Sequence, residues 1–196
     1  TVKYAIERLG ERVQEGLDVV GIATSKETEE RARRAGIPLE ELDEQPISVT
    51  IDGADQVDPA LQLIKGGGGA LLREKMVADR SQQEIIVVDD SKLVKSFTFP
   101  LPVEVTRYGW KSVAAHLREQ GLQPEVRPDF VTDNGNVILD CRYDTLNDLH
   151  SIAARLNAIP GVVEHGLFLD IATAVIIGTP KGAKTIRRNE SMAHTP

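Results

Sequence analysis

Short apolar runs alternate with amphipathic stretches through the first half of the chain. The opening residues place Val2, Ala5, Ile6 and Leu9 at helical spacing. We expect strands at 18–23, 47–51 and 84–88, a helix at 24–35 capped by Thr24, and a glycine-rich loop with a helix over 66–79. Buried strands separated by helices favour a parallel sheet, whose ligands bind beyond the carboxyl ends of its strands.

The pattern changes after Leu101, where strands and helices follow one another in the order βαββαβ. The strands are expected at 103–106, 125–126 with 130–132, 137–141 and 161–165, and the helices at 109–119 and 145–157. Asn134-Gly135 suits the tight turn of a hairpin. This order is typical of a ferredoxin-like domain.

The predicted fold is therefore α/β, an open, mostly parallel Rossmann-like sheet with an inserted ferredoxin-like βαββαβ domain. We expect residues 1–101 and 167–196 to form the larger α/β domain and residues 102–166 to form the small domain. An apolar strand at 171–178 returns to the first sheet. The polar end, 181–196, is expected to be partly disordered.

Composition narrows the classes of function. The 196 residues are 41% hydrophobic, which indicates a globular protein. Their formal net charge of -7 provides no positive field to attract nucleic acid. No apolar run is long enough to cross a membrane. A single cysteine, Cys141, cannot form an intrachain disulfide, which fits a cytoplasmic protein. The four histidines are scattered, and neither a metal nor a cofactor is expected.

The densest polar motif directly follows the apolar strand at 47–51. It reads Asp52-Gly53-Ala54-Asp55. Two carboxylates three residues apart can divide acid and base roles, and Gly53 lets the backbone approach a ligand closely. An aspartate-rich turn without any chemistry is the alternative.

A second motif begins ten residues after Asp55. Lys65 precedes four glycines, 66–69, and a helix follows them. The N–H groups of such a loop, a helix N-terminus and a lysine together suit an oxyanion or a developing enolate. The order of residues differs from a nucleotide-binding P-loop, in which the lysine follows the glycines. A flexible linker is the alternative.

Two further places could serve the same pocket. Glu74 lies about one turn into the helix after the glycines, where partial desolvation would make it a proton-abstracting base. Asp89 and Lys92 follow the strand at 84–88, and Lys92 could bind a phosphate as a point charge. The alternative interpretation of Glu74 is a charged residue on the surface. The alternative for Asp89 and Lys92 is a helix cap with solvated charge.

Taken in order and spacing, the three motifs resemble type A ribose-5-phosphate isomerase. They are Asp52-Gly-Ala-Asp55, Lys65-Gly-Gly-Gly-Gly-Ala-Leu-Leu-Arg-Glu74-Lys and Asp89-Asp-Ser-Lys92. The resemblance covers essentially the whole chain, including the closing Ile176-Ile177-Gly178-Thr179-Pro180. It implies interconversion of ribose 5-phosphate and ribulose 5-phosphate through an enediolate, without a metal, in the non-oxidative pentose phosphate pathway.

The resemblance also implies a role for each residue. Glu74 matches the general base, and Asp52, Asp55 and Lys65 match residues that open the sugar ring, hold its hydroxyls and stabilise the enediolate. The remaining matches are substrate-binding residues: Gly53, Ala54, the backbone cradle Gly66, Gly67 and Gly68, the pocket residue Asp89 and the phosphate ligand Lys92. The implied partner is a small sugar phosphate, and the implied assembly is a homodimer or homotetramer.

One part of the family pattern is incomplete. Thr1 matches the last residue of a Gly-Thr-Gly-Ser-Thr phosphate loop, and the sequence contains none of the preceding residues. Either the natural protein continues upstream and supplies this loop, or the chain starts at Thr1 and binds phosphate weakly.

Two other functions compete with the isomerase. Related folds serve as sugar-phosphate sensors in transcription regulators, which would not need a base opposite an oxyanion cradle. Coenzyme A transferases have a similar fold, but their glutamate attacks as a nucleophile. The paired aspartates and the single short sheet domain favour the isomerase.

Overall fold

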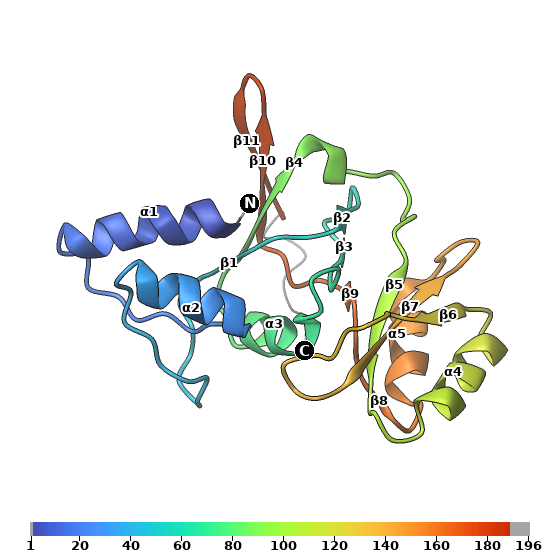
Figure 1. Ribbon diagram of the computed structural model, residues 1–196. Helices are drawn as coiled ribbons and strands as arrows, with labels where there is room; N and C mark the ends of the chain where they lie inside the picture. Colours follow the sequence, from blue (N-terminus) through green and yellow to red (C-terminus); the bar gives the residue numbers. More distant parts are fainter. Residues whose placement is uncertain (1, 189–196) are drawn as a thin grey trace.

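The computed structural model describes residues 2–188 and has an α/β fold with mixed sheets, as predicted. The principal sheet has the order β1-β4-β10-β11 (Figure 1). Strands β1 (Thr50–Asp52), β4 (Glu84–Asp89) and β10 (Ala174–Thr179) are parallel, and β11 (Gly182–Arg187) pairs antiparallel with β10. The three parallel strands therefore end at the same edge.

Three helices accompany this sheet. Helices α1 (Val2–Gln14) and α2 (Lys26–Arg34) lie side by side, and α3 (Leu71–Asp79) precedes β4. A Cβ atom at Gly10 of α1 would lie 2.7 Å from the Cβ of Ala35, so α1 and the end of α2 meet where there is no room for a side chain. None of the helices in residues 2–188 has the length and apolar character needed to cross a membrane.

Short strands connect the principal sheet to the rest of the molecule. Strands β2 (Gln56–Val57), β3 (Leu63–Ile64) and β9 (Leu167–Phe168) form an antiparallel sheet in the order β2-β3-β9. The N–H of Lys65 donates to the carbonyl of Gly166 at 2.9 Å, which continues this pairing. The residue that opens the glycine motif is thus held at the end of β3.

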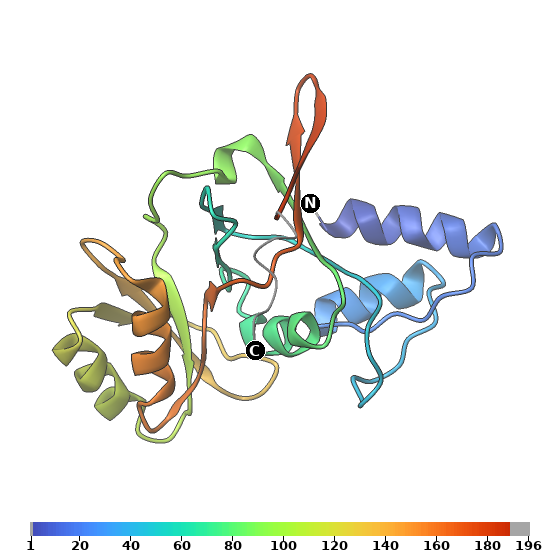
Figure 2. The same ribbon diagram turned by 180° about the vertical axis from the view of Figure 1, so that it is seen from behind.

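A second unit contains four antiparallel strands and two helices. Its elements follow one another as β5 (Leu101–Val105), α4 (Trp110–Glu119), β6 (Gln123–Val126), β7 (Val137–Arg142), α5 (Leu149–Asn157) and β8 (Val162–His165). The sheet order is β6-β7-β5-β8. Both views place α4 and α5 at the end of the molecule opposite α1 and α2 (Figure 2).

Two apolar cores stabilise the molecule, and β7 contributes to both. Leu139 belongs to the core beneath α4 and α5, whereas Ile138 belongs to the core that surrounds β4 and β10. Neighbouring residues of a strand point to opposite faces, so β7 has one face in each core. Both side chains are fully buried.

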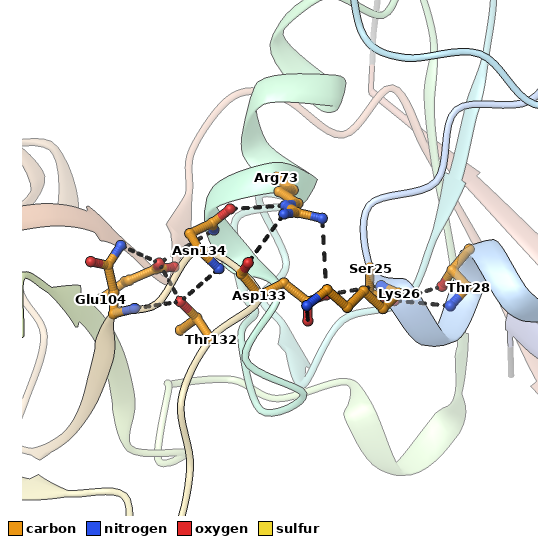
Figure 3. A network of polar contacts seen from close by, with 9 residues as sticks. Ser25, Lys26, Thr28, Arg73, Glu104, Thr132, Asp133 and Asn134 are labelled. Atoms are coloured by element: carbon orange, nitrogen blue, oxygen red, sulfur yellow. Dashed lines mark hydrogen bonds and ion pairs between the residues drawn. The ribbon is translucent and has the colours of Figure 1, made fainter.

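Polar contacts from the 132–136 loop bind the second unit to α2 and α3 (Figure 3). Asp133 accepts a 2.8 Å hydrogen bond from the backbone N–H of Lys26, the first residue of α2. Asn134 accepts one of 2.9 Å from the Nε of Arg73. Arg73 directly precedes Glu74, so this loop helps to fix the helix that presents Glu74.

Four predictions about local structure were wrong. Residues 18–23 form only a single bridge, Gly21 to Leu39, because their neighbours are residues 38–40 rather than the principal sheet. Ser25, not Thr24, caps α2 by accepting from the N–H of Thr28. Residues 130–132 form a loop instead of the expected strand. Helix α5 begins at Leu149, after the cap Asp148, and not at residue 145 as expected.

The polar end also differs from the expectation. Its described part, up to Arg188, contains strand β11, whose side chains are exposed and whose backbone pairs with β10 along its length. A two-stranded hairpin needs no apolar alternation on an exposed edge, which explains why the pattern did not reveal it. The rest of the predicted polar end, 189–196, lies outside the described residues.

Candidate active site

A cavity of about 240 Å³ opens at the carboxyl end of the principal sheet. It lies where β1 and β4 end, as expected for ligand sites of open α/β sheets. The residues that line it are Val2, Asp52, Gly53, Ala54, Asp55, Lys65, Gly66, Gly67, Gly68, Glu74, Val87, Val88, Asp89 and Lys92.

Lys65 is the buried cation of the site, with only 2% of the residue exposed. Its Nζ lies 2.9 Å from Asp52 Oδ2 and 3.2 Å from Glu74 Oε2, and it also donates to the carbonyl of Gly53. Burial opposes the charged form, but the carboxylates of Asp52 and Glu74 outweigh it and raise the pKa of Lys65. The ammonium is therefore charged in the folded protein at neutral pH.

Glu74 lies on the first turn of α3 and faces the cavity. Burial raises the pKa of its carboxyl more than the Lys65 ammonium lowers it, and the Asp52 carboxylate acts in the same direction as burial. Within residues 2–188, Glu74 Oε2 has the ion pair with Lys65 but no contact with hydrogen-bond geometry. A carboxyl with these properties is suited to accept a proton near neutral pH.

The glycine loop is shaped by Asp55 and by two left-handed glycines. Asp55 Oδ2 accepts a 2.7 Å hydrogen bond from the N–H of Gly67. Gly66 and Gly69 have φ angles of 104° and 80°, which favour glycine. In the described part of the chain, the N–H of Gly68 meets no acceptor. Gly68 lines the cavity, so the loop has one backbone donor there without a partner.

Asp89 and Lys92 come from the short 3₁₀ helix η1 (Asp90–Lys92) and the residue before it. Asp89 accepts a hydrogen bond from the Ser91 N–H at 3.0 Å, and its contact with the Ser91 hydroxyl lowers its pKa. Lys92 lines the cavity and has no ion pair with another residue in 2–188. Val2, the first residue of α1, lines the same cavity, so a helix N-terminus points a positive partial charge at the site.

Some residues near the site did not stand out in the sequence. Glu84 is 1% exposed, and both its carboxyl oxygens lack a partner in the described residues; burial raises its pKa to about 8. The ring of Phe168 lies 5.3 Å from Lys65 Nζ. Arg127 donates to two carbonyls of the glycine loop. None of these residues adjoins a motif, so spacing alone could not identify them.

The structure brings together every predicted site residue that it describes. Eleven residues from three separate motifs line one cavity, although they span positions 52 to 92. Thr1, the remaining predicted substrate-binding residue, lies outside the described residues. Residues 2–188 contain no cluster of three or more histidine, cysteine, aspartate or glutamate side chains placed to hold a metal ion.

Comparisons with known proteins identify relatives over most of the chain. Residues 20–182 match the family model for ribose 5-phosphate isomerase A (phosphoriboisomerase A). Ribose-5-phosphate isomerase A of Listeria monocytogenes serovar 1/2a is 48% identical, over 93% of this chain and 84% of its own length. The protein of that name from Chloroflexus aurantiacus is 46% identical, over 97% of this chain and 84% of its own length.

Solved structures agree with this result. A D-ribose-5-phosphate isomerase in complex with phospho-erythronic acid superposes with a TM-score of 0.92 at 40% identity, covering 95% of this chain and 86% of its own. The ribose 5-phosphate isomerase of Plasmodium falciparum gives a TM-score of 0.92 at 36% identity, over 96% and 87% of the two chains. The chain therefore belongs to the ribose 5-phosphate isomerase A family.

Proposed function

We propose that the protein interconverts D-ribose 5-phosphate and D-ribulose 5-phosphate through an enediolate. The observation that carries the proposal is the buried Lys65 ammonium, which contacts Asp52 and Glu74 beside the glycine loop. This arrangement combines a base with a cation and backbone donors. An aldose–ketose isomerisation needs both, because a proton leaves one carbon while negative charge develops on an oxygen.

Glu74 acts as the base in this proposal. Its carboxylate takes the proton from C2 of the open-chain aldose, the electron pair forms the C1–C2 double bond, and the former aldehyde oxygen carries the negative charge. A proton then passes from the C2 oxygen to the C1 oxygen, and Glu74 returns its proton to C1, which leaves a carbonyl at C2. The raised pKa of Glu74 supports this role.

Lys65 and the glycine loop stabilise the enediolate oxygen. Lys65 supplies a full positive charge in a buried place, and the cradle Gly66, Gly67 and Gly68 supplies the N–H of Gly68, which has no acceptor among the described residues. Removal of a single donor of this kind typically slows turnover by about 100- to 1,000-fold. Asp52 and Asp55 hold the sugar hydroxyls and assist ring opening. Both line the cavity, Asp52 beside the Lys65 ammonium and Asp55 beside the glycine loop, which supports these roles.

The phosphate binds near Lys92 and the N-terminus of α1. Lys92 offers a point charge, and the start of a 13-residue helix offers a partial one at the same cavity. Thr1, which the resemblance assigns to the phosphate loop, lies outside the described residues. Asp89 lines the cavity and also caps η1. Gly53 and Ala54, which line the same cavity, complete the proposed substrate-binding set.

The proposal includes the finer architecture. Residues 102–166 would form a ferredoxin-like domain inserted into a Rossmann-like catalytic domain of 1–101 and 167–196. The sheet order β6-β7-β5-β8 with its two helices supports this division. A homodimer or homotetramer and a cytoplasmic location remain proposals from the sequence.

The test follows ketose formation from ribose 5-phosphate in the presence of a metal chelator. The wild type should turn over at a rate that the chelator leaves unchanged. Glu74→Gln should lower kcat by about 100- to 10,000-fold while ribose 5-phosphate still binds. Glu125→Gln, which changes an exposed carboxylate of β6, serves as the control and should keep full activity.

Three results would contradict the proposal. Tight binding of ribose 5-phosphate without turnover by the wild type would favour the sugar-phosphate sensor. Loss of turnover in the chelator would show a metal requirement. A covalent thioester formed on Glu74 with an acyl-coenzyme A would favour the transferase.

A further inference from the structure

Arg127 lies in the second unit but reaches the glycine loop of the first. It follows β6, and its guanidinium donates to the carbonyl oxygens of Gly66 at 3.2 Å and Gly67 at 3.1 Å. In the sequence, Arg127 is 61 positions from Gly66 and 60 positions from Gly67. Arg127 does not line the cavity, so its contact with the loop is not part of the substrate site itself.

The guanidinium is itself held in place. Asp140 on β7 accepts two hydrogen bonds from it, 2.9 Å from Nε and 2.6 Å from Nη2. Such a bidentate pair fixes the plane of an arginine side chain. Phe130 lies under the guanidinium at 5.3 Å and also fills the space beside Gly69, where a Cβ would lie 2.1 Å from its ring. The second unit thus contacts both ends of the glycine loop.

These contacts determine which way the peptide groups of the loop face. A peptide group joins the carbonyl of one residue to the N–H of the next. In the Gly66–Gly67 peptide, Arg127 binds the oxygen and Asp55 binds the N–H, so both ends have partners. In the Gly67–Gly68 peptide, Arg127 binds the oxygen, whereas the N–H belongs to a residue that lines the cavity and has no acceptor among the described residues. Rotation of this second peptide would turn a carbonyl toward a negatively charged intermediate.

We propose that Arg127 is a positioning residue that keeps the Gly67–Gly68 peptide oriented with its N–H toward the enediolate oxygen. The inference rests on the proposed isomerase function and extends it to a residue outside the cavity. A hydrogen bond accepted by a carbonyl also polarises its peptide group, so Arg127 strengthens the Gly68 N–H as a donor. Glycines lack the side chains that would restrict such a rotation, and an external clamp replaces that restriction.

The experiment compares Arg127→Met, Arg127→Lys and a matched control, Arg142→Met. Arg142 also pairs with a carboxylate between β6 and β7, Glu125 at 3.0 Å, but does not approach the loop. For each variant, kcat and KM with ribose 5-phosphate are measured, together with the Kd of two probes. Phospho-erythronic acid carries a carboxylate, which places negative charge on oxygen as an enediolate does. Erythritol 4-phosphate, the corresponding alcohol, lacks that charge.

We expect Arg127→Met to lower kcat by about 10- to 100-fold and to raise the Kd of phospho-erythronic acid by a similar factor. Both quantities depend on the oriented N–H of Gly68. KM and the Kd of erythritol 4-phosphate should change by less than about threefold. Arg127→Lys keeps the charge and can bind one carbonyl, so its losses should be smaller. Arg142→Met should match the wild type in all four quantities.

The inference is wrong if Arg127→Met folds and keeps the wild-type kcat, or if it weakens both probes equally. If Arg127→Met does not fold, Arg127→Lys decides by the same comparison of the two probes. Failure of the proposed function would look different: the wild type would not convert ribose 5-phosphate. The selectivity between the charged and uncharged probes would then still test whether Arg127 orients the loop.

Discussion

Asp55 Oδ2 accepts a 2.7 Å hydrogen bond from the backbone N–H of Gly67, which joins the two motifs of the active site directly. The carboxylate that follows the first sheet strand thereby sets the conformation of the glycine loop. The fit is close, because a Cβ atom at Gly67 would lie 2.5 Å from Asp55 Oδ1. A Cβ at Gly68, the next residue, would meet no protein atom within 4 Å.

Gly67→Ala should therefore destabilise the protein, whereas Gly68→Ala should not. The new methyl group at position 67 must displace Asp55, and overpacking of this kind typically costs about 1–3 kcal/mol. Urea unfolding should show this loss for Gly67→Ala and a change within about 0.5 kcal/mol for Gly68→Ala. Equal stability of the two variants would mean that the contact between Asp55 and Gly67 does not restrain the loop.

Lys65→Met should abolish turnover and lower stability together. Two carboxylates would lose their buried counter-charge, and breaking a buried ion pair from one side costs about 3–5 kcal/mol. The pKa of Glu74 would rise further, since Lys65 is the group that lowers it. Activity and urea unfolding, both at neutral pH, measure the two effects.

Lys75→Met is the matched comparison for Lys65. Lys75 also lies over Phe168, at 4.8 Å, and pairs with Glu164 at 2.6 Å, but it does not line the cavity. Its loss should reduce stability and leave kcat within about tenfold of the wild type. An equal loss of activity in both variants would argue that the effect of Lys65 is purely structural.

Lys92→Met should raise KM for ribose 5-phosphate with a smaller change in kcat. A lysine that binds the phosphate contributes equally to the ground state and the transition state, so its removal weakens binding rather than chemistry. We expect an increase in KM of about tenfold or more, measured by initial rates at low salt. Lys95→Met, which changes an exposed lysine three residues later, should leave KM unchanged. An unaltered KM in Lys92→Met would exclude it as the phosphate ligand.

The sequence was sufficient to predict that the motifs adjoining strands lie together at one cavity. Asp52 and Asp89 end parallel strands, and the glycine loop and Glu74 belong to one continuous motif, so their convergence follows from the rule that ligands bind at strand ends. The βα order and the βαββαβ order of elements were also visible, because each depends on local periodicity.

Other features depend on contacts between segments that are remote in sequence. Arg127 reaches the glycine loop across 60 residues, and no spacing indicates this. Strands β2, β3 and β9 have two residues each, too few for a periodic pattern. Residues 18–23 looked like a strand because they are apolar, but a strand needs a paired neighbour, which only tertiary structure supplies.

Glu84 should make stability depend on pH in the direction opposite to an ordinary carboxylate. Burial raises its pKa from 4.5 to about 8, so between these values the folded protein keeps a proton that the unfolded chain has lost. The free energy of unfolding then falls as pH rises, by up to roughly 1.4 kcal/mol per pH unit for this one group. Below pH 4.5 both states are protonated and the group contributes no dependence.

Glu84→Gln removes this titration with almost no change of shape. The variant should gain stability relative to the wild type as pH rises from 5 to 8.5, by about 2 kcal/mol or more over that range, when urea unfolding is measured at each pH. Contributions from groups that do not interact with Glu84 cancel in the difference. Glu41→Gln, an exposed site, should give a difference that is flat with pH. A flat difference for Glu84→Gln would mean that its carboxyl is already ionised in the folded protein, and that Asp52, Lys65 and Glu74 interact with a charged rather than a neutral side chain.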